Sequence, residues 1–119
     1  MALTADASDA QAREQRRQAE EALRRLAHFD ALTGLPNRRE FHQQGTQALA
    51  LAQRQSLATT AVFFDLDQFK EVNDFHGHEA GDQVLVTVAE VLRSNLRASD
   101  VCGRLGGDEF AVLLPAADL

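Results

Sequence analysis

The fold is decided by one stretch near the end of the sequence, Cys102-Gly103-Arg104-Leu105-Gly106-Gly107-Asp108-Glu109-Phe110-Ala111-Val112-Leu113-Leu114. Short apolar runs flank the Gly106-Gly107 pair, which predicts a β-hairpin, because glycine accepts the positive φ of tight hairpin turns. Asp108 and Glu109 follow the turn at once, and carboxylates beside a bend without side chains suit a metal ion and a phosphate chain. An ordinary polar hairpin tip shows the same features. Whether this turn is a binding site therefore depends on which residues the rest of the chain places near it.

The composition limits the kinds of protein that this chain can be. The 119 residues, 45% of them hydrophobic, suffice for one modest packed domain and an appendage. The formal net charge of −6 argues against sequence-independent binding of nucleic acid, which needs basic side chains. The single cysteine, Cys102, excludes an intramolecular disulfide and a cysteine metal cluster. Lacking an apolar leader or membrane-spanning window, the domain is expected to be cytoplasmic, with any membrane anchor encoded outside this chain.

The first part of the chain predicts a long helix from about Asp6 to Phe29, because it is rich in Ala, Gln, Glu and Arg. Small and apolar residues recur at a 3-4 spacing that forms a narrow coiled-coil seam, at Ala12, Ala19, Ala22, Leu26 and Phe29. A solvated connector without a partner fits equally well. We therefore divide the chain into an N-terminal signalling or coiled-coil-type helix, residues 1–29, and a domain, residues 30–119.

The domain alternates predicted helices and strands. Asn37 and Glu40 predict a helix N-cap with its reciprocal partner, and the helix that follows repeats apolar or small residues on one face. Residues 57–64 form an apolar run that predicts a buried strand ending at Asp65. A second helical stripe runs from Ala80 to Arg97. The hairpin completes an α/β pattern.

Acidic residues from two distant segments predict a site. Asp65 ends a strand, and strand ends are where α/β folds place their ligands. If this strand pairs with the hairpin, Asp65, Asp108 and Glu109 form a three-carboxylate cluster, which burial would make too costly without a cation. Oxygen ligands favour Mg²⁺ or Mn²⁺, the ions of phosphoryl and nucleotidyl transfer. The alternative is that Asp65 caps the strand end in solvent.

Polar residues between the strand and the hairpin allow functional and structural interpretations. Lys70 can reach a phosphate or lie on the surface, while Asn73 and Asp82 match the polar edge of guanine or stabilise a loop. Arg97 with Asp100 suits a phosphorylated guanine ligand, although a cation also stabilises a helix C-terminus. His76 and His78 lack a third ligand type at suitable spacing, so zinc is not supported.

Taken together, these residues resemble the GGDEF family, the diguanylate cyclase domain that condenses two GTP molecules into cyclic di-GMP. The resemblance runs from Asp30 to Leu114 and comprises Asp30-x-Leu32-Thr33-Gly34-Leu35-x-Asn37-Arg38, Asp65-x-Asp67-x-Phe69-Lys70-x-x-Asn73-Asp74-x-x-Gly77-His78-x-x-Gly81-Asp82 and Arg104-Leu105-Gly106-Gly107-Asp108-Glu109-Phe110. It implies a partial nucleotidyl-cyclase-like, ferredoxin-like α/β sheet with helices, preceded by a long N-terminal helix.

The resemblance also implies roles for particular residues. Asp65, the Leu66 carbonyl and Asp108 would hold Mg²⁺ (or Mn²⁺) with help from Glu109, and Asp108 would activate the 3′-hydroxyl. Asn73 and Asp82 would bind guanine, whereas Lys70 and the Gly106-Gly107 turn would contact phosphates. Arg97 and Asp100 match the family's product-inhibition site, which implies feedback by cyclic di-GMP.

The same resemblance sets an expectation for activity. Family members continue past the hairpin into further helices and strands that include a basic segment for the triphosphate, so this chain alone is expected to be inactive or poorly active. Catalysis would need a homodimer that faces two GTP molecules toward each other, controlled through the N-terminal helix by an upstream sensor module. A non-catalytic module that binds GTP or cyclic di-GMP, or a structural signalling fragment, is the alternative.

Overall fold

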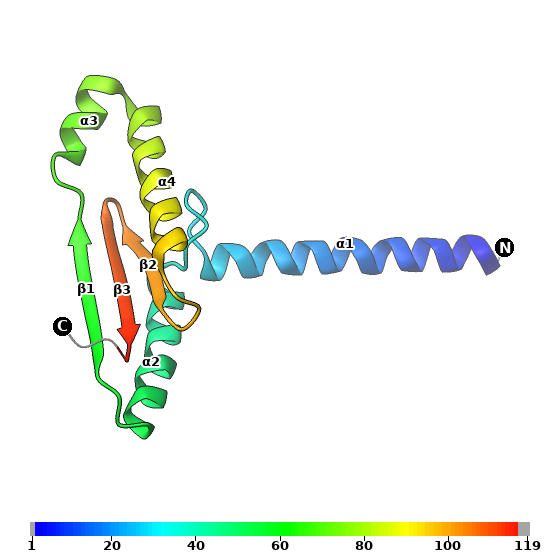
Figure 1. Ribbon diagram of the computed structural model, residues 1–119. Coiled ribbons are helices and arrows are strands. Elements are labelled where there is room, and N and C mark those ends of the chain that lie inside the picture. Colours follow the sequence, from blue (N-terminus) through cyan, green and yellow to red (C-terminus); the bar gives the residue numbers. More distant parts are fainter. Residues whose placement is uncertain (1, 117–119) are drawn as a thin grey trace.

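A computed structural model describes residues 2–116 of the chain, with side chains from residue 7 onward. In chain order its elements are α1 (Ala2–His28), α2 (Arg38–Arg54), β1 (Thr59–Asp65), α3 (Phe69–His76), α4 (His78–Asn95), β2 (Val101–Gly106) and β3 (Glu109–Pro115). Helix α1 projects away from the sheet and the other helices (Figure 1). The predicted mixed α/β fold is confirmed. None of the helices in the described residues is both long and apolar enough to cross a membrane.

The three strands form one antiparallel sheet in the order β1-β3-β2. The predicted hairpin is therefore confirmed, with β2 and β3 paired from Val101↔Leu113 to Gly106↔Glu109 and an irregularity between Arg104 and Gly106. Strand β1 joins the hairpin across a chain separation that spans α3 and α4, and it pairs only with β3 among the described strands. This pairing brings the end of β1 to the hairpin turn.

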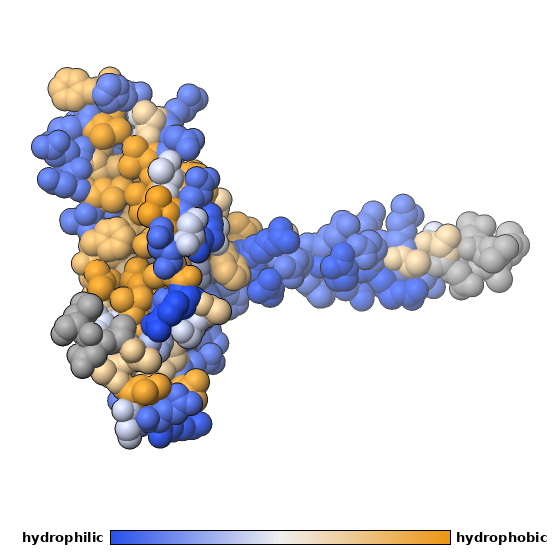
Figure 2. Space-filling model, viewed as in Figure 1, coloured by the Kyte–Doolittle hydropathy of each residue, from blue (hydrophilic) through white to orange (hydrophobic). Residues whose placement is uncertain are grey.

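The prediction that β1 is a buried strand is wrong. Among the described strands it lies at the edge of the sheet, where Val62 keeps 37% and Phe63 keeps 66% of its surface exposed. Its apolar residues predict a strand correctly, but they do not indicate whether a neighbour covers each side. Figure 2 shows hydrophobic side chains gathered over the sheet and its helices, whereas most of α1 is hydrophilic.

Helices cover the two faces of the sheet because strand residues alternate in direction. On one face, Gly103 of β2 lets Phe41 of α2 approach so closely that an added Cβ would lie 2.7 Å from the Phe41 Cβ. On the other face, Phe110 of β3 is fully buried against α4. The core cluster there contains Leu35, Leu85, Ala89 and Phe110, with Phe64, Leu66, Phe69, Val88, Leu92 and Cys102 packed against it.

The N-cap predicted for α2 is half correct. The Asn37 Oδ1 accepts a hydrogen bond from the Glu40 N–H at 2.9 Å. The reciprocal bond is wrong, because the Asn37 N–H donates to the His28 carbonyl at 2.9 Å. The Glu40 carboxylate instead lies 3.1 Å from His28 Nδ1 and accepts from Gln44. His28, the last residue of α1, therefore contacts the Asn37 N–H and the Glu40 carboxylate, the two groups that a reciprocal cap would join.

The segment between β1 and α4 contains the short helix α3, which the sequence analysis did not predict. Gly77, at φ +88°, is the single residue between α3 and α4. This left-handed conformation favours glycine and turns the chain sharply. The predicted stripe of α4 is confirmed at Leu85, Ala89 and Leu92.

Candidate functional site

The two acidic segments meet at one end of the sheet. Asp65, the last residue of β1, lies directly opposite Glu109, the first residue of β3. Opposed residues of an antiparallel pair extend from the same face of the sheet, so these two side chains are neighbours. One step further, the Leu66 N–H donates to the Asp108 carbonyl at 3.2 Å. The expected adjacency of the strand end and the hairpin is therefore observed.

The acidic side chains at this edge are open to solvent. Asp65 is exposed, the Glu109 side chain keeps 57% of its surface, and Asp108 is half-buried. Burial therefore does not force a cation onto these carboxylates, contrary to the prediction, because they are open to water. Within the described part of the chain, no three His, Cys, Asp or Glu side chains are grouped to hold a metal. The expected three-carboxylate cluster is thus not preassembled.

The donor set nevertheless fits an open site for a hard divalent cation. Mg²⁺ commonly takes one or two carboxylates together with substrate phosphates and water, without a closed protein cage. Asp65 and Glu109 supply two carboxylates on one face, with Asp108 next in the chain. An open pocket of about 290 Å³ adjoins them, lined by Phe63, Phe64, Asp65, Leu105, Glu109 and Phe110.

The hairpin turn presents bare backbone beside the acids. Gly106 has φ +151° and Gly107 has φ +51°, both in the region that favours glycine. A Cβ added at either position would meet no heavy atom within 4 Å, so the space beside the turn is open. A ligand can therefore approach the main chain here without displacing a side chain.

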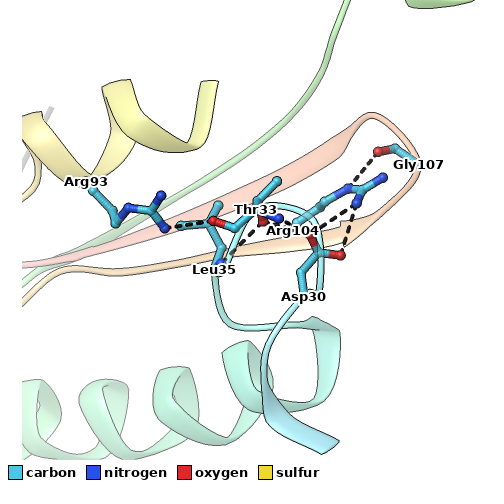
Figure 3. Close-up of polar contacts among 6 residues, drawn as sticks. All are labelled: Asp30, Thr33, Leu35, Arg93, Arg104 and Gly107. Atoms are coloured by element: carbon cyan, nitrogen blue, oxygen red, sulfur yellow. Dashed lines mark hydrogen bonds and ion pairs between the residues drawn. The ribbon is translucent and has the colours of Figure 1, made fainter. Parts of the chain in front are cut away.

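Arg104 connects this turn to Asp30, two residues beyond the end of α1 (Figure 3). Its Nε donates to the Gly107 carbonyl at 2.9 Å, and its Nη1 donates to both carboxylate oxygens of Asp30, at 3.0 and 3.1 Å. Asp30 Oδ2 also accepts from the Thr33 N–H and hydroxyl, each at 2.8 Å. Arg93 of α4 donates to the Thr33 carbonyl at 2.9 Å. One polar network thus joins the segment that follows α1, helix α4 and the hairpin turn.

Electrostatics favours an ionised Asp30. Burial opposes its ionisation, but the hydrogen bonds from Thr33 and the guanidinium of Arg104 outweigh burial and hold its pKa below the ordinary value. The side chains of Asp30 and Arg104 keep only 20% and 15% of their surfaces. A partly desolvated ion pair of this kind holds its geometry better than a surface pair.

Arg38 is a second arginine beside the turn. Its Nε donates to the Leu105 carbonyl at 3.3 Å, and its Nη2 lies 3.7 Å from the Glu109 carboxylate. The sequence interpretation gave neither Arg38 nor Arg104 a role at the site. Both arginines belong to the motifs that the sequence analysis quotes. Local spacing, however, does not indicate that Arg38 contacts Leu105 or that Arg104 contacts Asp30.

The residues predicted to bind a nucleotide lie on the hairpin of helices that follows β1. Lys70 is exposed in the first turn of α3, Asn73 is half-buried further along α3, and Asp82 is exposed on α4. The Asn73 side chain packs against Gly81, the residue before Asp82. The structure therefore brings Asn73 next to the backbone that carries Asp82.

Arg97 and Asp100 lie together between α4 and β2 and bind each other. Arg97 Nη2 is 2.9 Å from Asp100 Oδ1, and it also donates to the Pro115 carbonyl at 2.7 Å. Burial opposes ionisation of Asp100, whose side chain is 3% exposed, but hydrogen bonds from Arg97 hold its pKa below the usual value. Through the bond to the Pro115 carbonyl, the pair holds the last residue of β3 in place.

Comparisons with known proteins agree with this geometry. The family model "Diguanylate cyclase, GGDEF domain" matches residues 27–119. The chain is 50% identical over 93 residues to diguanylate cyclase TpbB of Pseudomonas aeruginosa, covering 78% of this chain and 21% of that protein. It is 47% identical over 92 residues to cyclic di-GMP phosphodiesterase NbdA of the same organism, covering 77% of this chain and 12% of that protein.

A solved structure extends the likeness to α1. The coiled coil and GGDEF domain of DgcB from Caulobacter crescentus, in complex with c-di-GMP, superimposes with a TM-score of 0.81 at 34% identity. The match covers 99% of this chain and 62% of that one. The chain therefore spans about a fifth or less of these two curated relatives and under two thirds of the DgcB chain.

Proposed function

We propose, from the premise that this chain belongs to the GGDEF family, that it forms part of a diguanylate cyclase, which condenses two GTP molecules into cyclic di-GMP and pyrophosphate. The observation that carries this proposal is the register of β1 and β3, which sets Asp65 opposite Glu109 beside an intact Gly-Gly-Asp-Glu-Phe turn. We divide the chain into a signalling helix, residues 1–29, and the N-terminal portion of the catalytic domain, residues 30–119.

A divalent cation, Mg²⁺ or Mn²⁺, would be held by Asp65, the Leu66 carbonyl and Asp108, with Glu109 assisting. When bound, such an ion neutralises phosphate charge. The hardness of the oxygen donors at the end of β1 supports this choice over zinc.

The remaining site residues would bind and orient GTP. The open backbone of Gly106 and Gly107 would accept the phosphate chain, and Lys70 would contribute a point charge. The carboxylate of Asp82 would accept the N–H groups of guanine, while the Asn73 amide would complete the match to its polar edge. Asp108 would take the proton from the attacking 3′-hydroxyl.

Each subunit would hold one GTP, so the reaction would need two copies of the chain facing each other. Each 3′-hydroxyl would attack the α-phosphorus of the other GTP in line, so that two phosphodiester bonds form and two pyrophosphates leave. Holding the two reactants face to face replaces a costly bimolecular encounter. Helix α1 would control this dimer, since Leu23 and Leu26 keep 65% and 69% of their surfaces exposed. An upstream sensor would act on α1, and the enzyme would work in the cytoplasm, where GTP is available.

The Arg97 and Asp100 pair would form a feedback site for cyclic di-GMP. Arg97 would exchange its bond to the Pro115 carbonyl for a phosphate oxygen, a stronger, charge-assisted partner. Binding there would be inhibitory.

Calorimetry with GTP, ATP and Mg²⁺, beside a cyclic di-GMP product assay, tests the proposal. We expect Mg²⁺-dependent binding of GTP in preference to ATP, little turnover by this chain alone, and loss of the Mg²⁺-dependent part in Asp65→Asn. Glu14→Gln, an exposed change on α1, is the matched control and should bind as the wild type does. Equal binding of GTP and ATP, or an Asp65→Asn variant that binds like the control, would contradict the assignment.

A non-catalytic module for GTP or cyclic di-GMP is the second candidate, favoured by the likeness to the DgcB GGDEF domain, which is solved in complex with c-di-GMP. The full-length protein decides between the two. Cyclic di-GMP formed from GTP supports the cyclase, whereas tight binding of either nucleotide with no product supports the module.

A further inference from the structure

The two helices of the α3–α4 hairpin meet face to face around one glycine. The Gly77 N–H donates to the Asn73 carbonyl at 2.9 Å, and the Gly77 carbonyl accepts from the Gly81 N–H at 3.2 Å. Asn73 and Gly81 therefore stand four residues before and four residues after the junction. The Asn73 side chain lies against Gly81, in the first turn of α4.

At that point α4 has no side chain. A Cβ added to Gly81 would overlap the Asn73 Oδ1 and lie 2.9 Å from its Cγ. Gly81 is buried, so the amide packs directly on the helix backbone. Because Asp82 is the next residue, this packing also fixes where the Asn73 amide lies relative to the chain that carries the carboxylate.

The other helical glycine provides a contrast. A Cβ added to Gly45 of α2 would meet only the Leu113 Cδ2, at 3.7 Å, which is ordinary van der Waals contact. Both glycines lower the stability of a helix relative to alanine. Only at Gly81 does the missing side chain make room for a polar group of the candidate site.

We propose that Gly81 is a positioning residue for guanine recognition, because its bare backbone lets the Asn73 amide lie beside Asp82. This inference rests on the proposed function, in which those two side chains bind the base. A larger residue at position 81 turns the Asn73 amide away, since an asparagine side chain rotates more readily than a helix backbone moves. The fold survives, and the match to guanine is lost.

The test compares Gly81→Ala with Gly45→Ala, which gains the same helix propensity without a clash. Calorimetry with GTP and ATP should show about tenfold weaker GTP binding for Gly81→Ala, the order expected for one hydrogen bond lost, with ATP binding unchanged. Gly45→Ala should bind both nucleotides as the wild type does. In the Asn73→Ala background, where no amide remains to displace, Gly81→Ala should have no further effect.

The ligand-free protein gives an independent readout. The side-chain amide signal of Asn73 in a ¹⁵N–¹H spectrum should move in Gly81→Ala and stay in place in Gly45→Ala. Wild-type GTP affinity in Gly81→Ala would overturn the inference and leave the guanine site standing. So would a Gly81→Ala change that weakens GTP binding as much in the Asn73→Ala background as it does in the wild type. A wild-type chain that does not prefer GTP overturns the guanine site itself, and the inference with it.

Discussion

Replacing Asp30 by asparagine should destabilise the domain by about 2 kcal/mol, because the change puts an N–H₂ group where only acceptors fit. Asp30 Oδ2 accepts from the Thr33 N–H and hydroxyl, and both carboxylate oxygens accept from Arg104. An asparagine keeps one oxygen, so in either orientation of the amide at least one donor faces another donor.

The magnitude follows from burial and charge. A hydrogen bond to a charged group contributes about 1.5–3 kcal/mol, and a surface ion pair contributes about 0–1 kcal/mol. The side chains of Asp30 and Arg104 keep 20% and 15% of their surfaces, which places the pair between these limits and nearer the first. The loss of one such bond, with the others weakened, gives the stated value.

Urea unfolding followed by circular dichroism measures the free energy of unfolding. The matched control is Glu21→Gln on α1, which also removes a carboxylate bound to an arginine, Arg24, at 2.8 Å. That pair is on the surface, so its loss should leave the unfolding midpoint of the domain unchanged. A cycle with Arg104→Gln should give a coupling energy of at least about 1 kcal/mol.

An Asp30→Asn variant whose free energy of unfolding lies within about 0.5 kcal/mol of the wild-type value, the range of ordinary surface substitutions, would contradict this prediction. Additive effects of Asp30→Asn and Arg104→Gln would also contradict it, since additive losses mean that the two side chains do not stabilise each other.

Three further outcomes can be measured on the same chain. The pKa of Asp30 is lowered in the folded state, so its ionised carboxylate stabilises the fold at pH values above the unfolded pKa of about 3.9. This stabilisation is lost as the carboxylate is protonated at lower pH. The difference in free energy of unfolding between wild type and Asp30→Asn should therefore shrink below about pH 4. Gly103→Ala should cost about 1–3 kcal/mol in urea unfolding, because its Cβ would lie 2.7 Å from the Phe41 Cβ and 3.0 Å from the Pro36 carbonyl, neither of which is the end of a flexible side chain. Burial raises the pKa of the Cys102 thiol, so a disulfide reagent at pH 8 should label it more slowly in the native protein than in urea, and equal rates would show that the thiol is exposed.

The local structure was predictable where neighbouring residues decide it. Gly106 and Gly107 specify a tight turn between two apolar runs, and the hairpin forms there. Asn37 caps α2, and the apolar spacing of α4 places Leu85 and Ala89 in the core. Each of these features depends on residues a few positions apart, whose contacts follow from the period of a helix or strand.

Other features needed the tertiary structure. The edge position of β1, and with it the exposure of Asp65 and Phe63, depends on which strand pairs with which, and an apolar run does not record its number of neighbours. Helix α3 was missed because its eight residues, Phe69–His76, are few and mostly polar.

The sequence by itself determined the family motifs, the hairpin and the identities of the acidic residues at its turn. Only the tertiary structure decided that Asp30 and Arg104, 74 residues apart, bind each other, and that Asn73 packs on Gly81. The physical reason is that hydrogen bonds and close packing act over a few ångströms, whereas separation along the chain sets no distance in space until the strands and helices are paired.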